Sequence, residues 1–138
     1  MSGKSVVGVM TAVIDGELEK NAYRKFKIIQ QKNDDTAGLR EVLIRRFNHP
    51  EWQFPDLIVI DGGLGQKNAT EQLLAELNIN IPVVSVVKDT RHKPNHFLGD
   101  EKLVALRSTA ILKANAEAHR FAIAYHKNLR KRTFFGRN

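Results

Sequence analysis

Two runs of apolar residues, 57–60 and 81–87, stand out in the middle of the chain. Four consecutive aliphatic residues in the first run indicate a strand buried on both faces, as in a mostly parallel sheet. Between the runs, residues 66–77 carry apolar positions at helical spacing. The order strand, helix, strand predicts a right-handed parallel crossover.

The hydrophobic pattern on the N-terminal side predicts an antiparallel pair followed by a helix. Residues 5–14 and 23–30 have strand character, and a turn-rich link that opens at Asp15 connects them. A helix start signal, residues 33–36, comes next. The helix behind it ends near Pro50 and has one apolar face, formed by Leu39, Val42, Leu43 and Phe47.

On the C-terminal side, the pattern predicts a loop or hairpin tip at 92–100 and a short strand at 102–106. Ser108 or Thr109 is then expected to cap a long helix that runs to about Arg130. With 138 residues, 42% of them hydrophobic, the chain has the size of one domain, 1–138.

Composition excludes several classes of protein. No apolar run approaches membrane-spanning length, and the chain does not open with a signal-peptide pattern. The absence of cysteine excludes disulfides and thiolate metal sites. We therefore expect a soluble, cytoplasmic protein with no membrane partner.

Positive charge is concentrated at one end of the chain. Residues 119–138 hold six basic and no acidic side chains, whereas the first 118 residues hold 16 basic and 15 acidic ones. A basic tail at 127–138 beside a balanced body indicates contact with a polyanion such as nucleic acid, although cations also suit a helix C-terminus. The candidate nucleic-acid contacts are Arg24, Lys88, Arg91, Lys93, Arg120, Lys127, Arg130, Lys131 and Arg132.

Asp61 follows the first buried strand directly and precedes two glycines. Open α/β sheets place their ligands at this end of a strand, and an ionised group there needs a partner such as a divalent cation. The glycines allow the backbone a sharp turn. A nucleotide-binding turn is the rival interpretation, but the spacing is not G-x-G-x-x-G, so we expect no nucleotide cofactor.

Several stretches together resemble the C-terminal endonuclease domain of UvrC, the excinuclease subunit of bacterial nucleotide excision repair. The most specific are IDGGLGQ at 60–66 and EAHRFA at 117–122, and segments 6–14, 23–28 and 34–47 match in the same order. The resemblance implies a ribonuclease H-like mixed sheet flanked by helices. It also implies an endonuclease that uses Mg²⁺ or Mn²⁺ to cut DNA on the 5′ side of a lesion, with DNA and a UvrB–DNA complex as partners.

The resemblance assigns three catalytic candidates. Asp61 matches the family's second aspartate and is expected to bind metal, His119 matches its histidine, and Asp35 matches a further aspartate of the site. His119 is expected to bind a metal ion or to move a proton, and its structural alternative is a hydrogen-bonded core histidine. For Asp35 the structural alternative is a helix N-cap.

One departure from the family concerns its first aspartate, which lies in an opening strand resembling Asp-Ile-Ser-His. This chain starts at Met1 just past that strand. The resemblance thus implies that the chain lacks the first strand, its carboxylate and a helix-hairpin-helix region, which leaves a gap in the sheet and an inactive isolated chain. The alternative function is a non-catalytic DNA-binding or scaffold module of the same fold.

Overall fold

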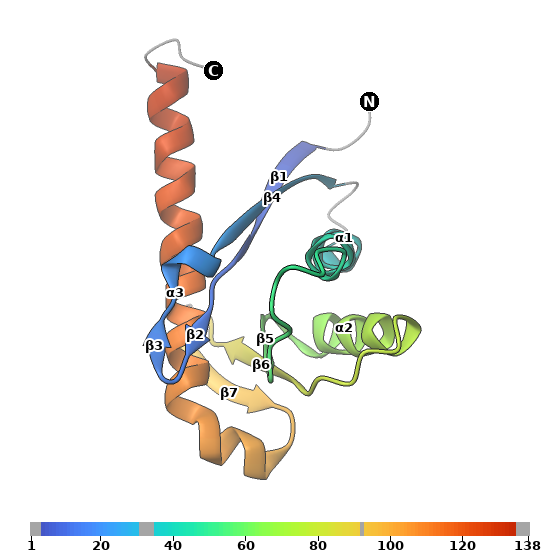
Figure 1. Ribbon diagram of the computed structural model, residues 1–138. Coiled ribbons are helices and arrows are strands. Elements are labelled where there is room, and N and C mark those ends of the chain that lie inside the picture. Colours follow the sequence, from blue (N-terminus) through green and yellow to red (C-terminus); the bar gives the residue numbers. More distant parts are fainter. Residues whose placement is uncertain (1–3, 31–34, 92, 135–138) are drawn as a thin grey trace.

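The structure, a computed structural model, describes residues 4–30, 35–91 and 93–134. Figure 1 shows the long helix α3 on one side of the strands and helices α1 and α2 on the other. In chain order the elements are β1 (Lys4–Met10), β2 (Val13–Ile14), β3 (Glu17–Leu18), the 3-10 helix η1 (Lys20–Ala22), β4 (Arg24–Gln30), α1 (Asp35–Phe47), β5 (Ile58–Asp61), α2 (Leu64–Glu76), β6 (Val83–Lys88), β7 (Pro94–Leu98) and α3 (Glu101–Phe134).

The predicted antiparallel pair is confirmed, with β1 and β4 in register from Lys4 opposite Gln30 to Met10 opposite Arg24. The predicted strand 5–14 is nevertheless interrupted, because the chain leaves the ladder after Met10. There the Thr11 hydroxyl donates a hydrogen bond to the Ala114 carbonyl of α3 over 3.2 Å. The two-residue strands β2 and β3 then form a separate small hairpin.

The predicted crossover is also confirmed, since β5 and β6 pair in parallel and α2 connects them. The buried residues Ile60, Leu74 and Val83 form one core cluster on the side of α2. Val84, Val86 and Ile111 form a second cluster, in which α3 packs against the sheet. Each face of β6 therefore supplies a different part of the core.

Two predictions on the C-terminal side are wrong. Residues 102–106 are not a strand, because α3 already begins at Glu101, and a carboxylate oxygen of Asp100 accepts a hydrogen bond from the Leu103 amide over 2.9 Å. The cap therefore lies at Asp100 and not at Ser108 or Thr109.

Part of the predicted 92–100 loop is strand β7, which pairs antiparallel with β6. The predicted basic tail is helical as far as Phe134.

The described strands form three separate sheets: β1–β4, β2–β3 and β5–β6–β7. Within the described residues, no backbone ladder joins the β1–β4 hairpin to β5. Helix α3 packs against both parts, with contacts to β1 and β5. Side-chain packing, rather than a continuous ladder, thus sets the position of the hairpin.

Gly8 in β1 offers a test of the packing of the hairpin against α1, which also contacts β1 and β4. A Cβ atom added at Gly8 would collide with Cγ2 of Val42 in α1, and the β-branched valine has little freedom to move aside. We expect Gly8→Ala to lower the free energy of unfolding by about 1–3 kcal/mol in urea denaturation. Gly65→Ala is the control, since a Cβ there meets nothing within 4 Å and should be neutral or stabilising. Equal stabilities of the two variants would contradict this packing.

Candidate functional site

Asp61 ends β5 opposite Val86 of β6, and its side chain is 48% exposed. Its carboxylate forms an ion pair with the ammonium of Lys88, with 2.7 Å between Oδ1 and Nζ. The Lys88 side chain is only 17% exposed. The structure thus places a charged pair at the ends of β5 and β6, and the cation beside Asp61 is an ammonium group of the protein itself.

The turn after Asp61 explains part of the IDGGLGQ motif. The side-chain oxygen of Gln66 accepts a hydrogen bond from the Gly63 amide over 3.1 Å, which satisfies a free N–H at the start of α2. A Cβ at Gly62 would lie 3.1 Å from Gln66 Cδ, so the folded-back glutamine leaves little room for a side chain there. This packing fixes the path of the chain as it leaves Asp61.

His119 lies on an exposed part of α3. Its structural alternative, a buried core histidine, is therefore wrong. Asp35 is the first residue of α1, but its side chain lies outside the described part of the structure. Among the described residues, no three His, Asp or Glu side chains come close enough together to hold a metal ion. Of the predicted site residues whose side chains the structure describes, Lys88 is the one in direct contact with Asp61.

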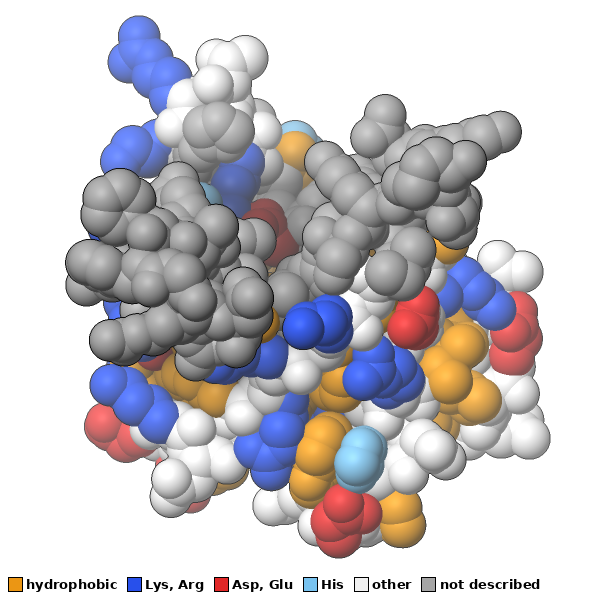
Figure 2. All heavy atoms as spheres, turned by 90° about the horizontal axis from the view of Figure 1, so that it is seen from above, with side chains coloured by type: hydrophobic (Ala, Val, Ile, Leu, Met, Phe, Trp, Pro, Cys, Tyr) orange, Lys and Arg blue, Asp and Glu red, His pale blue; other side chains and the backbone are white. Residues whose placement is uncertain are grey.

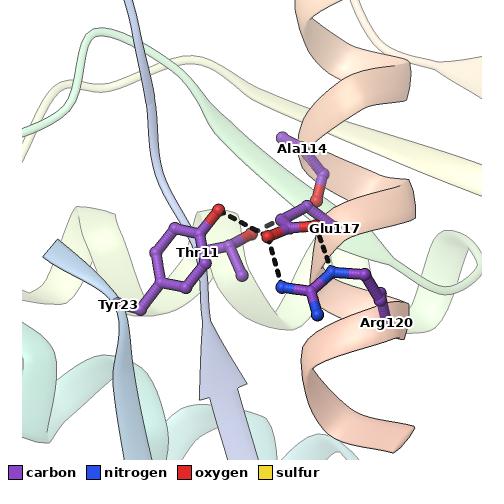
Figure 3. Close-up of polar contacts among 5 residues, drawn as sticks. All are labelled: Thr11, Tyr23, Ala114, Glu117 and Arg120. Carbon is purple, nitrogen blue, oxygen red and sulfur yellow. Dashed lines mark hydrogen bonds and ion pairs between the residues drawn. The ribbon is translucent and has the colours of Figure 1, made fainter. Parts of the chain in front are cut away.

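The sequence analysis did not single out a buried carboxylate, Glu117, which is 7% exposed. Arg120 donates to it twice, from Nε to Oε1 and from Nη2 to Oε2, each over 2.7 Å. The Tyr23 hydroxyl donates to Oε2 over 2.8 Å. Figure 3 shows Tyr23 reaching across to α3, with Thr11 bonded to Ala114 beside it. These contacts attach the loop before β4 to α3.

Electrostatics keep Glu117 ionised. The hydrogen bonds from Arg120 lower the pKa of Glu117 to about 2, and they outweigh the opposing effect of burial, with a further contribution from Tyr23. Burial, followed by the hydrogen bond to Glu117, raises the pKa of Tyr23 to about 12. Tyr23 therefore stays a donor and Glu117 an acceptor over the whole physiological pH range. The Glu and Arg spacing of three residues within α3 was the available sequence signal.

The predicted DNA contacts differ in how they are held. The Arg24 guanidinium lies 4.4 Å from the centre of the Trp52 ring and donates to the backbone carbonyls of Asn21 and Tyr23. Arg120 is bound to Glu117, although its side chain remains 56% exposed. Lys127 is exposed on α3. Figure 2 shows Lys and Arg side chains gathered across the middle of the face seen from above.

The remaining predicted contacts lie in the β6–β7 turn and in the last turns of α3. The amides of Arg91 and Lys93 both donate to Oδ1 of Asp89, over 2.8 and 2.9 Å, and both side chains are exposed. The side chains of Arg130, Lys131 and Arg132 lie outside the described part of the structure.

The model of the UvrC RNase H endonuclease domain family matches residues 1–123 of this chain. The chain belongs to this family. The matched range includes both Asp61 and His119 and ends before Lys127. A mixed α/β architecture with three α-helices and small sheets is consistent with a ribonuclease H-like domain.

Curated relatives of this UvrC domain agree with the family match. UvrABC system protein C of Caldicellulosiruptor saccharolyticus is 39% identical over 143 residues, which cover 98% of this chain and 24% of the relative. The proteins of the same name from Clostridium novyi and Methanothermobacter thermautotrophicus are 38% and 35% identical, and each match covers 96% of this chain. The chain spans about a quarter of the length of these relatives. In the described part of the chain, no helix has the length and apolar character needed to cross a membrane.

The buried carboxylate of the UvrC domain gives a pH prediction. Because the folded pKa of Glu117 is lowered to about 2 from an ordinary value of 4.5, its stabilising contribution is complete above pH 4.5 and is lost as the pH falls toward 2. We expect Glu117→Gln to lower the free energy of unfolding by about 1–3 kcal/mol at pH 7. In urea denaturation, the difference in the free energy of unfolding between Glu117→Gln and the wild type should become smaller as the pH falls below 4.5.

Glu71→Gln is the matched control, because Glu71 pairs with Lys67 on the surface of α2 and is 48% exposed. We expect it to change stability by well under 1 kcal/mol. A Glu117→Gln effect as small as that of the control, or one that does not vary between pH 7 and pH 3, would contradict the role assigned to Glu117.

Proposed function

We propose that this chain is a divalent-metal-dependent DNA endonuclease domain that makes the 5′-side incision at damaged DNA in nucleotide excision repair. Membership of the UvrC RNase H endonuclease domain family carries the proposal. The position of Asp61 supports it, since open α/β sheets hold their ligands at the C-terminal ends of their strands. DNA and a UvrB–DNA complex are the proposed partners.

The residues around Asp61 fit a metal ion in their chemistry. A half-exposed carboxylate is the hard oxygen ligand that Mg²⁺ and Mn²⁺ prefer, and Lys88 shows that a cation already lies beside it. One carboxylate alone does not form a complete site, so His119 is the proposed second ligand, and Asp35 is a further catalytic candidate. When bound, the metal would supply an activated water and neutralise charge on the phosphate.

The protein's own groups have separate proposed roles. Asp61 supplies a carboxylate at the strand end that would hold the divalent cation. His119 is exposed to solvent, and its imidazole can accept or release a proton there. The Glu117–Arg120 pair fixes the turn of α3 from which His119 projects.

Substitution of the two site residues tests the catalytic proposal. In the protein that carries this chain, we expect Asp61→Asn and His119→Ala each to reduce Mn²⁺-dependent nicking of lesion-containing duplex DNA by at least about a hundredfold. Asp56→Asn, an exposed carboxylate just before β5, is the control and should retain activity. DNA binding without metal-dependent nicking by the wild-type protein would favour the non-catalytic DNA-binding or scaffold module instead.

The salt dependence of DNA binding tests the basic end of α3. Because phosphate contacts release counterions, removal of two contacts with Lys127→Gln and Arg130→Gln should lower the slope of log affinity against log salt by about 1.8 on duplex DNA. Binding should weaken equally for all sequences. The control removes two exposed charges from the other end of α3, with Lys102→Gln and Arg107→Gln, and should leave the slope unchanged. Equal slopes for the two double variants would contradict this interface.

A further inference from the structure

We propose that Lys88 is a built-in counter-ion of Asp61, which occupies the position of a metal ion and must be displaced before a divalent cation binds. This inference rests on the proposed metal-binding role of Asp61. It assigns Lys88 a regulatory part in metal binding, whereas the sequence analysis treated it as a direct DNA contact.

The geometry of the pair carries the proposal. The ammonium of Lys88 approaches Asp61 Oδ1 to 2.7 Å, the distance of a charge-assisted hydrogen bond. The Lys88 side chain is mostly buried, while the Asp61 side chain is about half exposed. The lysine therefore approaches from the protein side, and the carboxylate stays open to solvent on the other.

The register of β5 and β6 places Lys88 beside Asp61. Asp61 lies opposite Val86, and Lys88 follows Val86 by two residues, so both charged residues belong to the same face of the sheet. Lys88 is also the last residue of β6, next to a register shift in which the extra residue belongs to β7. The arrangement thus depends on the pairing of β5 with β6 and not on a chance encounter of two surface side chains.

Charge explains why the two cations exclude each other. An ammonium in contact with the carboxylate occupies one of its oxygens, and it repels a divalent ion that approaches the other. A neutral side chain at position 88 removes both effects. Even at the dielectric constant of water, the repulsion between one unit charge and a divalent ion at about 4 Å corresponds to roughly a thirtyfold change in affinity, so a shift of at least about fivefold is expected.

A purely structural ion pair makes a different prediction. If Lys88 only stabilised the strand ends, a neutral residue would leave the metal affinity of Asp61 unchanged or lower it by loosening the site. The structural pair Lys67–Glu71 provides a matched control. Its ammonium lies 2.8 Å from a carboxylate and its lysine side chain is 14% exposed, but its partner is not Asp61.

Mn²⁺ titration in the full chain tests the proposal by paramagnetic broadening of the amide signals of Asp61, Gly62 and Gly63. We expect Lys88→Met to shift the midpoint to at least about a fivefold lower Mn²⁺ concentration. Lys67→Met removes the same charge and should leave the midpoint unchanged. Lys88→Gln is the second variant. If Lys88→Met folds poorly, Lys88→Gln replaces it, and we expect the same shift of the midpoint.

A measurement on the wild-type chain needs no substitution. Addition of Mg²⁺ should move the side-chain ammonium resonance of Lys88 toward that of a solvent-exposed lysine, while the Lys67 resonance stays in place. A Lys88 resonance that does not move while the Asp61 amide responds to Mg²⁺ would overturn the proposed displacement.

Asp61→Asn separates failure of this inference from failure of the proposed function. Loss of broadening in Asp61→Asn, together with an unchanged or higher midpoint in Lys88→Met, would overturn the role of Lys88 and leave Asp61 as a metal ligand. Broadening that persists at residues 61–63 in Asp61→Asn would overturn the proposed metal site itself.

Discussion

The structure depends on the buried carboxylate of Glu117 and its two partners. Since the described strands form no continuous ladder between the β1–β4 hairpin and β5, helix packing holds the two together: α3 contacts β1 and β5, and α1 contacts both hairpin strands and the Ile60 cluster. Burial of an unpaired carboxylate where the hairpin meets α3 would be strongly unfavourable. Arg120 and Tyr23 satisfy this carboxylate from α3 and from the loop before β4, so the contacts that stabilise Glu117 also attach that loop to α3.

The parts of the fold that could be predicted from sequence are those in which local pattern and final packing agree. The apolar runs gave the parallel β5–β6 pair correctly, because both strands are buried by helices on two sides. The expected strand at 102–106 failed because a short apolar stretch suits a strand or a helix equally well. Two contacts stabilise the helix here: Leu103 and Val104 pack against the cluster of Val84, Val86 and Ile111, and Asp100 caps the helix N-terminus.

In the candidate site, too, one part could be predicted from sequence and another could not. Asp61 could be placed at a strand end from sequence because its neighbours define the strand. Its pairing with Lys88 could not be predicted from sequence, since that contact depends on the register between β5 and β6. The Tyr23–Glu117 contact joins residues 94 positions apart, and local sequence pattern carries no signal at that separation. The pairing of Arg120 with Glu117, three residues apart on one helix, is by contrast a local contact that the spacing could have indicated.

The two carboxylates differ in a way that bears on function. Glu117 accepts three hydrogen bonds from groups on two elements and is almost fully buried, so an exchange of its partners would require α3 to move. Asp61 accepts one described ion pair, from a long and flexible side chain, and half of its surface faces solvent. A lysine ammonium on four rotatable bonds can leave without any change in the backbone. Asp61 is therefore able to exchange one cation for another while Glu117 keeps the surrounding framework in place.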